Sequence, residues 1–151
     1  MHVCFVCSGN ICRSPMAAVV FREHLRRAGL ADLVRVTSAG IGDWHVGQPA
    51  DSRAARTLAG AGYSTEHVAA QVGADHLDAD LLVAMDSGHH VELVELAGPD
   101  RVRMFRSFDP AADDTLDVPD PYYGERNGFN QVLDMIEAAT PGLLDWVRAH
   151  L

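Results

Sequence analysis

The side chains with the clearest chemistry lie near the N-terminus, in the segment VCFVCSGNICRS. Cys7 ends an apolar run, and Arg13 follows after a short stretch that contains Gly9 and Asn10. A short loop between a buried strand and a helix points its backbone N–H groups inward, forming an anion cradle at the positive end of the helix dipole. Gly9 and Asn10 tolerate positive φ, and the Arg13 guanidinium is suited to hold two oxygens of a tetrahedral phosphate. The pattern predicts a phosphate-binding loop.

Cys7 lies at the bottom of this cradle and is the candidate nucleophile. A helix N-terminus and a neighbouring guanidinium stabilise the thiolate, which is the reactive form of cysteine. The Ser14 hydroxyl is placed either to donate a hydrogen bond to the sulfur or to cap the helix. Cys4 is interpreted as an inert thiol of the core. The same interpretation of Cys7 would leave the nearby glycine and arginine without a role. Cys4 and Cys7 also have the spacing of redox motifs, but those motifs open a helix, whereas this helix is expected to begin near Ser14 and Pro15.

Four apolar segments predict the strands that position this loop. Their continuous rather than alternating hydrophobicity is typical of strands buried on both faces in a parallel sheet. The segments are Val3–Cys7, Leu33–Ser38, Leu81–Met85 and Val102–Phe105. In such sheets a ligand binds at the carboxyl ends of the strands, beside a change in strand order, and Cys7 lies at such an end.

Helical periodicity between and after these segments predicts helices that alternate with the strands. Three are predicted, from about Pro15 to Gly29, from an Asp51 cap to about Ala59, and from Asp86–Ser87 to about Gly98. Two more are predicted in the C-terminal region, divided at Pro141-Gly142 because that dipeptide breaks helices. The alternation indicates one α/β layer sandwich with a small parallel sheet, a single domain over residues 1–151.

Composition and charge restrict the class of protein. The formal charge of −9 argues against partners such as nucleic acid or an anionic membrane surface. No apolar run approaches the ~20 residues that span a bilayer, and no secretory pattern precedes the first strand, so the expected compartment is cytoplasmic. The cysteines are crowded near the start, as Cys4, Cys7 and Cys12, which indicates reduced thiols rather than a disulfide framework.

The segment VCFVCSGNICRSPMAA resembles the active-site loop of the low-molecular-weight protein tyrosine phosphatases, which carry a Cys-x5-Arg-Ser signature after the first strand. The resemblance implies that Cys7 and Arg13 are catalytic and that the rest of the loop binds phosphate. The phosphate-binding residues would be Ser8, Gly9, Asn10, Ile11, Cys12 and Ser14. The resemblance covers most of the chain and implies a three-layer α/β sandwich, with a four-stranded parallel sheet and helices on both faces.

Transfer of a phosphoryl group to sulfur needs an acid for the departing phenolate, and the stretch FDPAADDTLDVPDPYYGE offers several. The candidates are Asp109, Asp113, Asp114, Asp117 and Asp120. Composition does not choose among them, but DPYYG resembles the family's general-acid loop, which implies that Asp120 is the acid. Pro121 would then stiffen the loop. Tyr122 and Tyr123 would form aromatic walls of the substrate site, the alternative being packing on the surface.

The same resemblance gives roles to residues elsewhere in the chain. Trp44, among Gly, Asp and His, matches an aromatic that flanks the substrate ring. Asp86 matches a carboxylate that orients Arg13, although it is also a candidate helix cap. His67 matches a histidine that supports Asn10, the alternative being a surface histidine. One departure is MDSGHH, where relatives often carry an asparagine, so no contact is assigned to that segment.

The implied reaction is hydrolysis of a phosphotyrosine-containing protein through a phosphocysteine on Cys7, with Asp120 as acid and then as base. No metal and no cofactor are required, because Arg13 and the loop amides stabilise the charge on the phosphoryl oxygens. The chain is expected to be mostly monomeric, with weak self-association at most. Cys12 is close enough in sequence to form a disulfide with an oxidised Cys7.

Other functions fit the sequence less well. Arsenate reductases share this loop and fold but relay oxidation through further cysteines, and no cysteine follows Cys12. Arginine phosphatases of the same family typically carry threonine at the position of Ile11, whose apolar side chain favours an aromatic substrate. A catalytically inactive phosphotyrosine-binding module would not need Cys7, Arg13 and Asp120 together.

Overall fold

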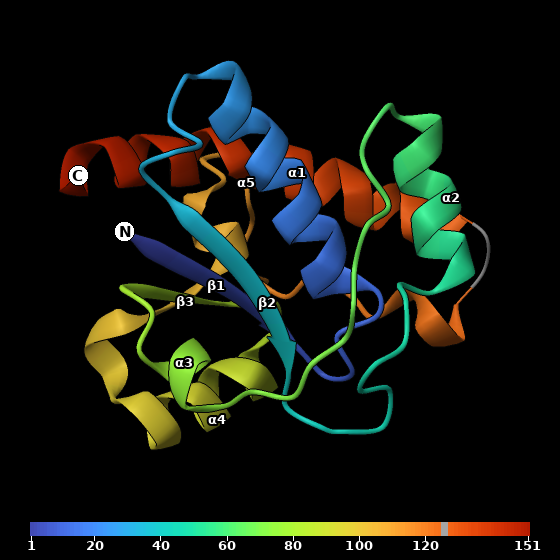
Figure 1. The fold of residues 1–151 in the computed structure, drawn as a ribbon, viewed down its shortest axis with the longest axis horizontal. Helices are drawn as coiled ribbons and strands as arrows, with labels where there is room; N and C mark the ends of the chain where they lie inside the picture. The colour runs from blue at the N-terminus through green and yellow to red at the C-terminus, as the bar shows by residue number, and fades with distance from the viewer. Residues whose placement is uncertain (125–126) are drawn as a thin grey trace.

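The computed structural model describes residues 1–124 and 127–151 and contains a four-stranded parallel sheet (Figure 1). Its strands are β1 (His2–Cys7), β2 (Arg35–Gly40), β3 (Leu81–Ala84) and β4 (Val102–Met104). They lie in the order β2-β1-β3-β4. The chain passes from β1 to β2 on one side and later crosses to β3 on the other. This change of direction lies at the carboxyl end of β1, where α/β sheets bind their ligands.

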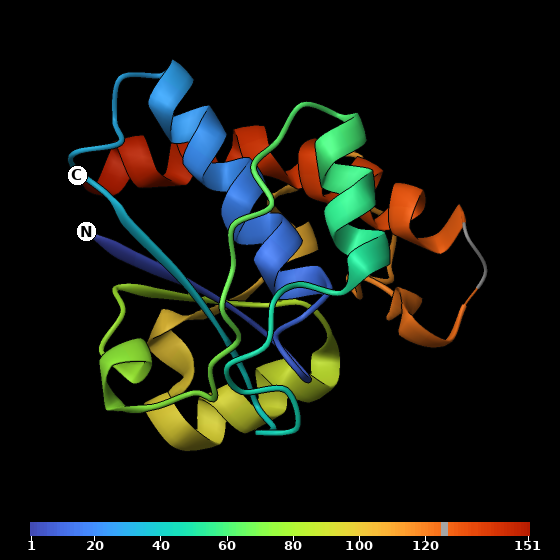
Figure 2. The same cartoon turned by 45° about the vertical axis from the view of Figure 1, so that its right-hand side comes forward.

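Helices cover both faces of this sheet, as Figures 1 and 2 show. On one face α1 (Arg13–Arg27) packs on β1 and β2 and against α5 (Asn127–His150), which also contacts α2 (Ser52–Gly60). On the other face α4 (Ser87–Ala97) packs on β3 and β4, and the short α3 (Ala74–Leu77) contacts β2. The predicted three-layer sandwich is confirmed. Within the described ranges, no helix is both long enough and apolar enough to cross a membrane.

Elements of a single turn were not predicted, because they hold too few residues to show a periodic pattern. Besides α3 they are the 3-10 turns η1 (Pro99–Arg101), η2 (Phe105–Phe108) and η3 (Pro121–Tyr123). Of these, η3 directly follows Asp120, the predicted acid, which holds its N-cap position.

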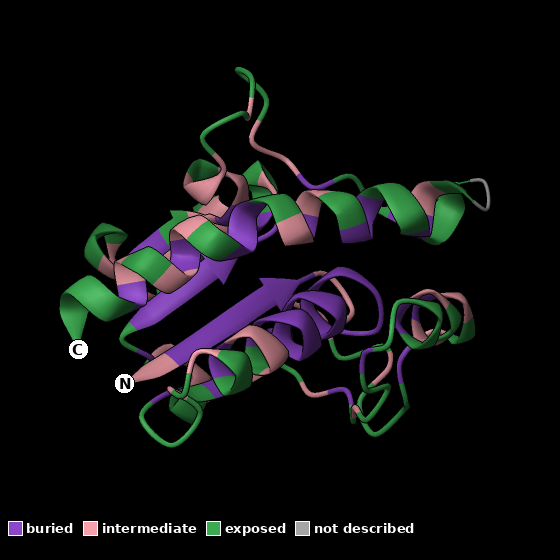
Figure 3. Cartoon of the chain, turned by 90° about the horizontal axis from the view of Figure 1, so that it is seen from above, coloured by how far each residue is buried: buried purple, intermediate pink, exposed green. Residues whose placement is uncertain are grey.

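The central strand β1 contributes to two separate cores. Val3 and Phe5 pack into the core shared with α1 and α5, whereas Cys4 and Val6 pack into the core under α4. All four side chains are fully buried, and Figure 3 shows the strands buried between the helical layers. Burial on both faces accounts for the uninterrupted hydrophobic sequence of this strand.

The second strand is displaced from its predicted range. Leu33, predicted as its first residue, is 56% exposed, and β2 instead runs from Arg35, which pairs with His2, to Gly40, which pairs with Cys7. The strand therefore ends directly beside the candidate nucleophile, and the residues that follow it reach the same edge of the sheet.

The prediction of two C-terminal helices is wrong, because α5 continues through Pro141. The stripe of buried residues runs on across the proline, from Ile136 to Leu143 and Val147, and packing of that stripe offsets the missing backbone hydrogen bond. Gly142 is not a breaker either. A Cβ atom at this position would overlap the carbonyl oxygen of Phe108, so the glycine permits close contact between α5 and η2.

Candidate active site

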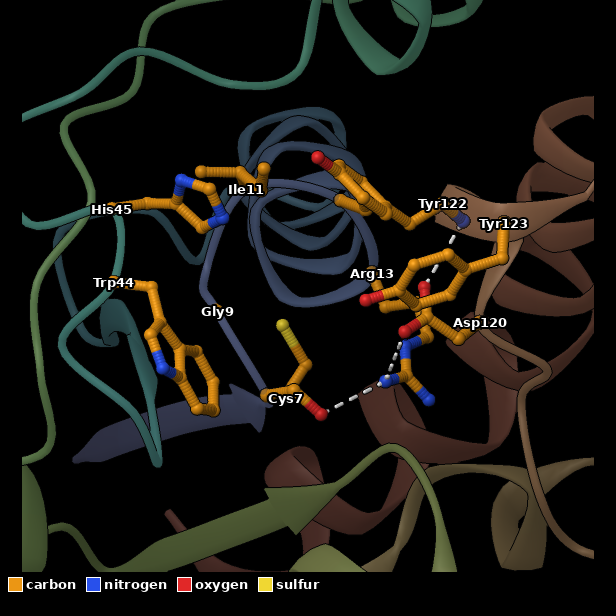
Figure 4. A pocket seen from close by; sticks show the side chains of 11 residues that line it. Cys7, Gly9, Ile11, Arg13, Trp44, His45, Asp120, Tyr122 and Tyr123 are labelled. Carbon is orange, nitrogen blue, oxygen red and sulfur yellow. Dashed lines mark hydrogen bonds and ion pairs between the residues drawn. The ribbon is translucent and has the colours of Figure 1, made fainter.

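A cavity of about 410 Å³ opens at the carboxyl end of β1. Figure 4 shows the Cys7 sulfur pointing into it, with Trp44 and His45 on one side and Tyr122 and Tyr123 on the other. The residues that line the cavity are Cys7, Ser8, Gly9, Ile11, Cys12, Arg13, Trp44, His45, Asp120, Tyr122 and Tyr123. Of the predicted site residues, Asn10, Ser14, His67 and Asp86 are not among the lining residues. They lie behind it, as their contacts show.

Asn10 sets the path of the loop between β1 and α1. It is fully buried, and its backbone has a φ of 58°, a conformation that asparagine tolerates. The side-chain Nδ2 donates to Ser14 Oγ at 2.8 Å and to Ser38 Oγ at 3.0 Å, and Oδ1 accepts from the Ala70 N–H at 2.9 Å. The Asn10 carbonyl oxygen lies 2.6 Å from His67 Nε2. Asn10 therefore holds the loop in shape from behind.

Of the two loop residues that tolerate positive φ, Asn10 adopts it and Gly9 does not. Gly9 is needed for close packing: a Cβ atom there would lie 2.9 Å from His45 Cδ2. A Cβ atom at Gly42 would likewise overlap the ring of Trp44. His45 and Trp44, in the loop after β2, therefore pack directly on the backbone of Gly9 and Gly42. This packing holds in place the cavity wall that the two rings form.

Gly40→Ala is expected to lower the free energy of unfolding by about 1–3 kcal/mol and to weaken phosphate binding, because the added methyl group meets rigid backbone. A Cβ atom at Gly40 would lie 2.9 Å from the Ser8 carbonyl oxygen and 3.0 Å from the Gly9 carbonyl carbon. Urea unfolding and inhibition by inorganic phosphate measure the two effects. Gly60→Ala is the control, since its Cβ meets nothing within 4 Å. Equal effects of the two substitutions would contradict the prediction.

Ser14 Oγ lies 2.8 Å from Cys7 Sγ. Because Ser14 Oγ already accepts a hydrogen bond from Asn10 Nδ2, its own hydrogen is free to point at the sulfur. Of the two predicted roles for Ser14, this geometry favours donation over capping, since Cys12 holds the N-cap position of α1. The donated hydrogen bond and the N-terminus of α1 both stabilise a thiolate on Cys7.

Cys12 belongs to the same loop but lies in a different environment. Its side chain is 5% exposed, and burial, reinforced by the charge of Asp51, raises the pKa of the Cys12 thiol to about 12. Cys12 therefore stays protonated at neutral pH. This leaves Cys7 as the cysteine of the cavity suited to nucleophilic attack.

The guanidinium of Arg13 is held by groups from several elements. Nη1 donates to Asp86 Oδ2 at 2.9 Å and to the Val118 carbonyl oxygen at 3.0 Å. Nη2 donates to Ser8 Oγ at 3.3 Å and lies 3.5 Å from Asp120 Oδ2. The side chain is 3% exposed, so these partners compensate for the desolvation of a buried charge and fix its orientation.

Asp86 has both of the roles between which the sequence left a choice. Its Oδ2 pairs with Arg13, and its Oδ1 accepts the His89 N–H at 3.0 Å, which caps α4. Burial disfavours the charged form, but the bonds from His89 and Arg13 outweigh this, and the pKa of Asp86 is lowered. Asp86 is therefore an anion that can hold Arg13 at neutral pH.

Asp120 reaches the cavity from the start of η3. Its Oδ1 accepts the Tyr122 N–H at 3.1 Å, which leaves Oδ2 facing Arg13. The rings of Tyr122 and Tyr123 pack edge to face, 4.9 Å apart. Tyr123 is 88% exposed and Trp44 is 68% exposed, so large aromatic surfaces are left uncovered at the mouth of the cavity.

An ion pair outside the cavity ties this acidic segment to α2. Arg53 pairs with Asp51, and its Nη1 donates to the Tyr122 carbonyl oxygen at 3.2 Å. The guanidinium also lies 5.3 Å from the centre of the Tyr122 ring. Asp51 in turn donates its backbone N–H to the Ile11 carbonyl oxygen at 2.8 Å. The pair therefore connects the loop after β1 with the segment that carries Asp120.

Arg53→Ala is expected to lower kcat on an aryl phosphate roughly tenfold, because a displaced Asp120 transfers its proton less efficiently. Steady-state kinetics measure kcat and KM separately, and KM should change less than kcat. Arg56→Ala, an exposed arginine on the same helix, is the control. A rise in KM with an unchanged kcat would show that Arg53 acts on substrate binding rather than on the acid.

Comparison with known proteins identifies the family. A family-wide sequence profile for the low molecular weight phosphotyrosine protein phosphatases matches residues 2–151. The chain belongs to this phosphatase family. Low molecular weight protein-tyrosine phosphatase A of Mycobacterium tuberculosis is 57% identical over 154 residues, covering 100% of this chain and 94% of that protein.

Solved structures agree with this assignment. The crystal structure of the protein tyrosine phosphatase from Entamoeba histolytica has a TM-score of 0.94 at 32% identity and covers 99% of this chain and 98% of that chain. The structure of a Drosophila arginine phosphatase has a TM-score of 0.89 at 29% identity, covering 97% of this chain and 98% of that chain. The fold is therefore shared by phosphatases that are named for different substrates.

Three residues near the site of this phosphatase were missed in the sequence. His45 lines the cavity, and its position next to Trp44 was the one available signal. Arg53 contacts the acidic segment, and His89 lies 2.9 Å from Ser8 Oγ through its Nε2 atom. Both contacts join residues far apart in the chain, and the segment with His89 is the one where the resemblance to relatives failed.

The stability of the phosphatase is expected to fall as the pH drops from 6.5 to 4. Burial lowers the pKa of His89 from 6.5 to about 4, and burial also lowers that of His67. In this interval the unfolded chain binds the protons that the folded chain does not, so acid favours unfolding. His89 alone contributes about 3 kcal/mol. Urea unfolding across this pH range should show a steeper loss for the wild type than for His89→Gln, and parallel curves would contradict the prediction.

Proposed function

We propose that the chain hydrolyses phosphotyrosine in proteins through a phosphocysteine on Cys7. The observation that carries this proposal is the convergence of three groups on one cavity: the Cys7 sulfur, the buried Arg13 guanidinium and the Asp120 carboxylate. The family and the tyrosine phosphatase named among its relatives support the same reaction.

In the first step the Cys7 thiolate attacks phosphorus, and the bond from phosphorus to the tyrosyl oxygen breaks. Asp120 donates its proton to that departing oxygen, so that phenol rather than phenolate leaves. Arg13 and the backbone N–H groups of the loop bind the three equatorial oxygens, whose charge they stabilise in the transition state. The hydrogen bond from Ser14 supports the thiolate before attack.

In the second step water attacks the phosphocysteine from the position that the tyrosine has left. Asp120, now a carboxylate, accepts the proton of that water, and the bond between phosphorus and sulfur breaks. Inorganic phosphate leaves, and Cys7 returns to the thiolate. Both steps conserve atoms and charge, with the positive charge of Arg13 and the N–H donors of the loop facing the phosphoryl oxygens.

The lining of the cavity supports an aromatic substrate. Trp44 stands across the opening from Tyr122 and Tyr123, and Ile11 adds an apolar side chain to the wall. A phenyl ring between such walls buries its faces against aromatic carbon, which a short phosphoserine side chain does not reach. Phosphoarginine would carry a polar guanidinium past Ile11, which is why we propose phosphotyrosine over phosphoarginine.

We further propose that residues 1–151 act as one domain, mostly monomeric and in the cytoplasm, on phosphotyrosine-containing proteins. The charge of −9 is unfavourable for binding nucleic acid or an anionic membrane. Because the same charge repels anionic substrates at long range, affinity must come from the local donors of the loop around Arg13.

The decisive test is a panel of phosphotyrosine, phosphoserine and phosphoarginine compounds, together with p-nitrophenyl phosphate. We expect kcat/KM to be highest for phosphotyrosine peptides, and aryl phosphates to be the preferred small substrates. A preference for phosphoarginine would overturn the substrate assignment but not the cysteine chemistry. Absence of turnover on every compound would overturn the enzymatic function and leave a binding module.

A further inference from the structure

A ring of polar contacts joins Arg13 and Ser8, which line the cavity, to Asp86 and His89, which do not. Arg13 pairs with Asp86 through Nη1 and donates to Ser8 Oγ through Nη2. His89 closes the ring, since its Nε2 lies 2.9 Å from Ser8 Oγ in a hydrogen bond, and its Nδ1 lies 3.2 Å from Asp86 Oδ1 as an electrostatic contact without hydrogen-bond geometry. The side chain of His89 is 7% exposed, and the hydrogen bond between Nε2 and Ser8 is the one that its ring makes among the described residues.

The donors and acceptors of this ring can be assigned. Arg13 has only donors, so Ser8 Oγ accepts from it and keeps its own hydrogen for another partner. That hydrogen points to Nε2 of His89, which must then be the unprotonated nitrogen. The proton of a neutral imidazole is therefore on Nδ1, where it faces the carboxylate of Asp86. The hydrogen bonds of this set run from Asp86 through Arg13 and Ser8 to His89, whose Nδ1 has only the electrostatic contact with Asp86.

We propose that His89 is a positioning residue for Arg13 and acts through the hydroxyl of Ser8. The neutral imidazole turns the Ser8 oxygen toward Nη2, and Asp86 holds Nη1, so the guanidinium is fixed at both of its terminal nitrogens. This inference rests on the proposed function, because Arg13 is the group that would bind the phosphoryl oxygens. It gives a role to the segment MDSGHH, to which the sequence assigned none.

The charges around His89 keep it in the required form. Asp86, Asp117 and Asp120 favour its protonation, whereas burial and the neighbouring Arg13 oppose it. Burial is the largest of these effects and lowers the pKa of His89 to about 4. The imidazole is therefore neutral at the pH at which the enzyme would work, and Nε2 remains an acceptor.

Two near-isosteric substitutions separate the contacts of the imidazole. His89→Gln keeps an acceptor oxygen near the position of Nε2, whereas His89→Asn keeps a donor near Nδ1 but leaves Ser8 without its acceptor. We expect His89→Asn to lower kcat/KM for p-nitrophenyl phosphate about tenfold and to weaken phosphate binding by a similar factor. His89→Gln should recover to within about threefold of the wild type. His90→Asn, on the neighbouring histidine, is the control.

A double-mutant cycle with Ser8→Ala tests the route through Ser8. Ser8→Ala alone should match His89→Asn, and the double mutant should lose no more than either single variant, because all three break the same chain of contacts. The proposal would be overturned if the double mutant lost the product of the two single-variant losses in kcat/KM. It would also be overturned if His89→Gln and His89→Asn lost the same activity. A fall in unfolding free energy with unchanged kinetics would also overturn it, since that would show a structural role alone.

Calorimetry with inorganic phosphate separates this inference from the proposed function, because binding needs no turnover. If the wild type bound phosphate but hydrolysed no substrate, the proposed function would fail. The ratio of phosphate affinities between His89→Gln and His89→Asn would still decide the role of His89. If turnover were normal and this ratio were near one, the proposed function would stand and the positioning role would fail.

Discussion

Cys7→Ser is expected to lower kcat by a factor on the order of 10⁵ or more, the largest effect of any single substitution in the chain. A serine hydroxyl is not ionised at neutral pH. A hydrogen bond donated by Ser14 and a helix N-terminus favour a thiolate nucleophile, but the same surroundings leave a serine hydroxyl protonated. The measurement is steady-state hydrolysis of p-nitrophenyl phosphate, with acid quenching of labelled substrate to trap the phosphoenzyme.

Two controls make this result specific. Inorganic phosphate should still bind to Cys7→Ser in calorimetry, because Arg13 and the loop amides are unchanged. Cys4→Ala removes another cysteine of β1, whose side chain lies in the core under α4, and should keep nearly normal kcat. A phosphoenzyme trapped on a residue other than Cys7, or appreciable turnover by Cys7→Ser, would disprove the nucleophile assignment.

Asp120→Asn is expected to lower kcat on aryl phosphates by about 10²–10⁴, because the amide cannot protonate the departing oxygen. The loss should grow with the basicity of the phenol that leaves, since a strongly basic phenolate depends most on an acid. A series of aryl phosphates with phenols of rising pKa measures this dependence. The hydrogen bond from the Tyr122 N–H can be kept by the amide oxygen, so the turn should survive the substitution.

The matched control for the acid is Asp114→Asn, in the same acidic stretch. Asp114 is exposed and does not line the cavity, so its neutralisation should leave kcat unchanged. Near-normal rates for Asp120→Asn, or a loss independent of the leaving group, would place the acid elsewhere. Asp117 would then be the next residue to test, since its Oδ1 accepts the Ser87 N–H close to Asp86.

The parts of this site that could be predicted are those set by neighbouring residues. The end of an apolar strand, an asparagine that tolerates positive φ and the start of a helix all fall between Cys7 and Arg13, so the loop follows from local rules. The caps at Asp51 and Asp86 follow from local rules in the same way. The identity of the general acid did not follow from local rules, because several aspartates share one stretch. Only the resemblance to a family selected Asp120.

The parts that could not be predicted depend on packing between distant segments. Nothing near Gly40 in the chain reveals that its backbone contacts the loop of Ser8 and Gly9. The contact of His89 with Ser8 also joins segments that are far apart in the chain, so no local pattern predicts it. In the C-terminal region packing outweighed a local signal. Pro141 predicted a helix end, but the buried stripe that continues through α5 keeps the helix intact.

The exposed indole of Trp44 gives the protein a built-in optical probe. The chain has two tryptophans, and the other, Trp146, stacks on His150 at 4.0 Å and does not line the cavity. An aromatic ligand that enters the cavity displaces water from Trp44 and leaves the surroundings of Trp146 unchanged. Fluorescence emission should therefore report occupancy directly, in inactive variants as well as in the working enzyme, without any labelling of the chain.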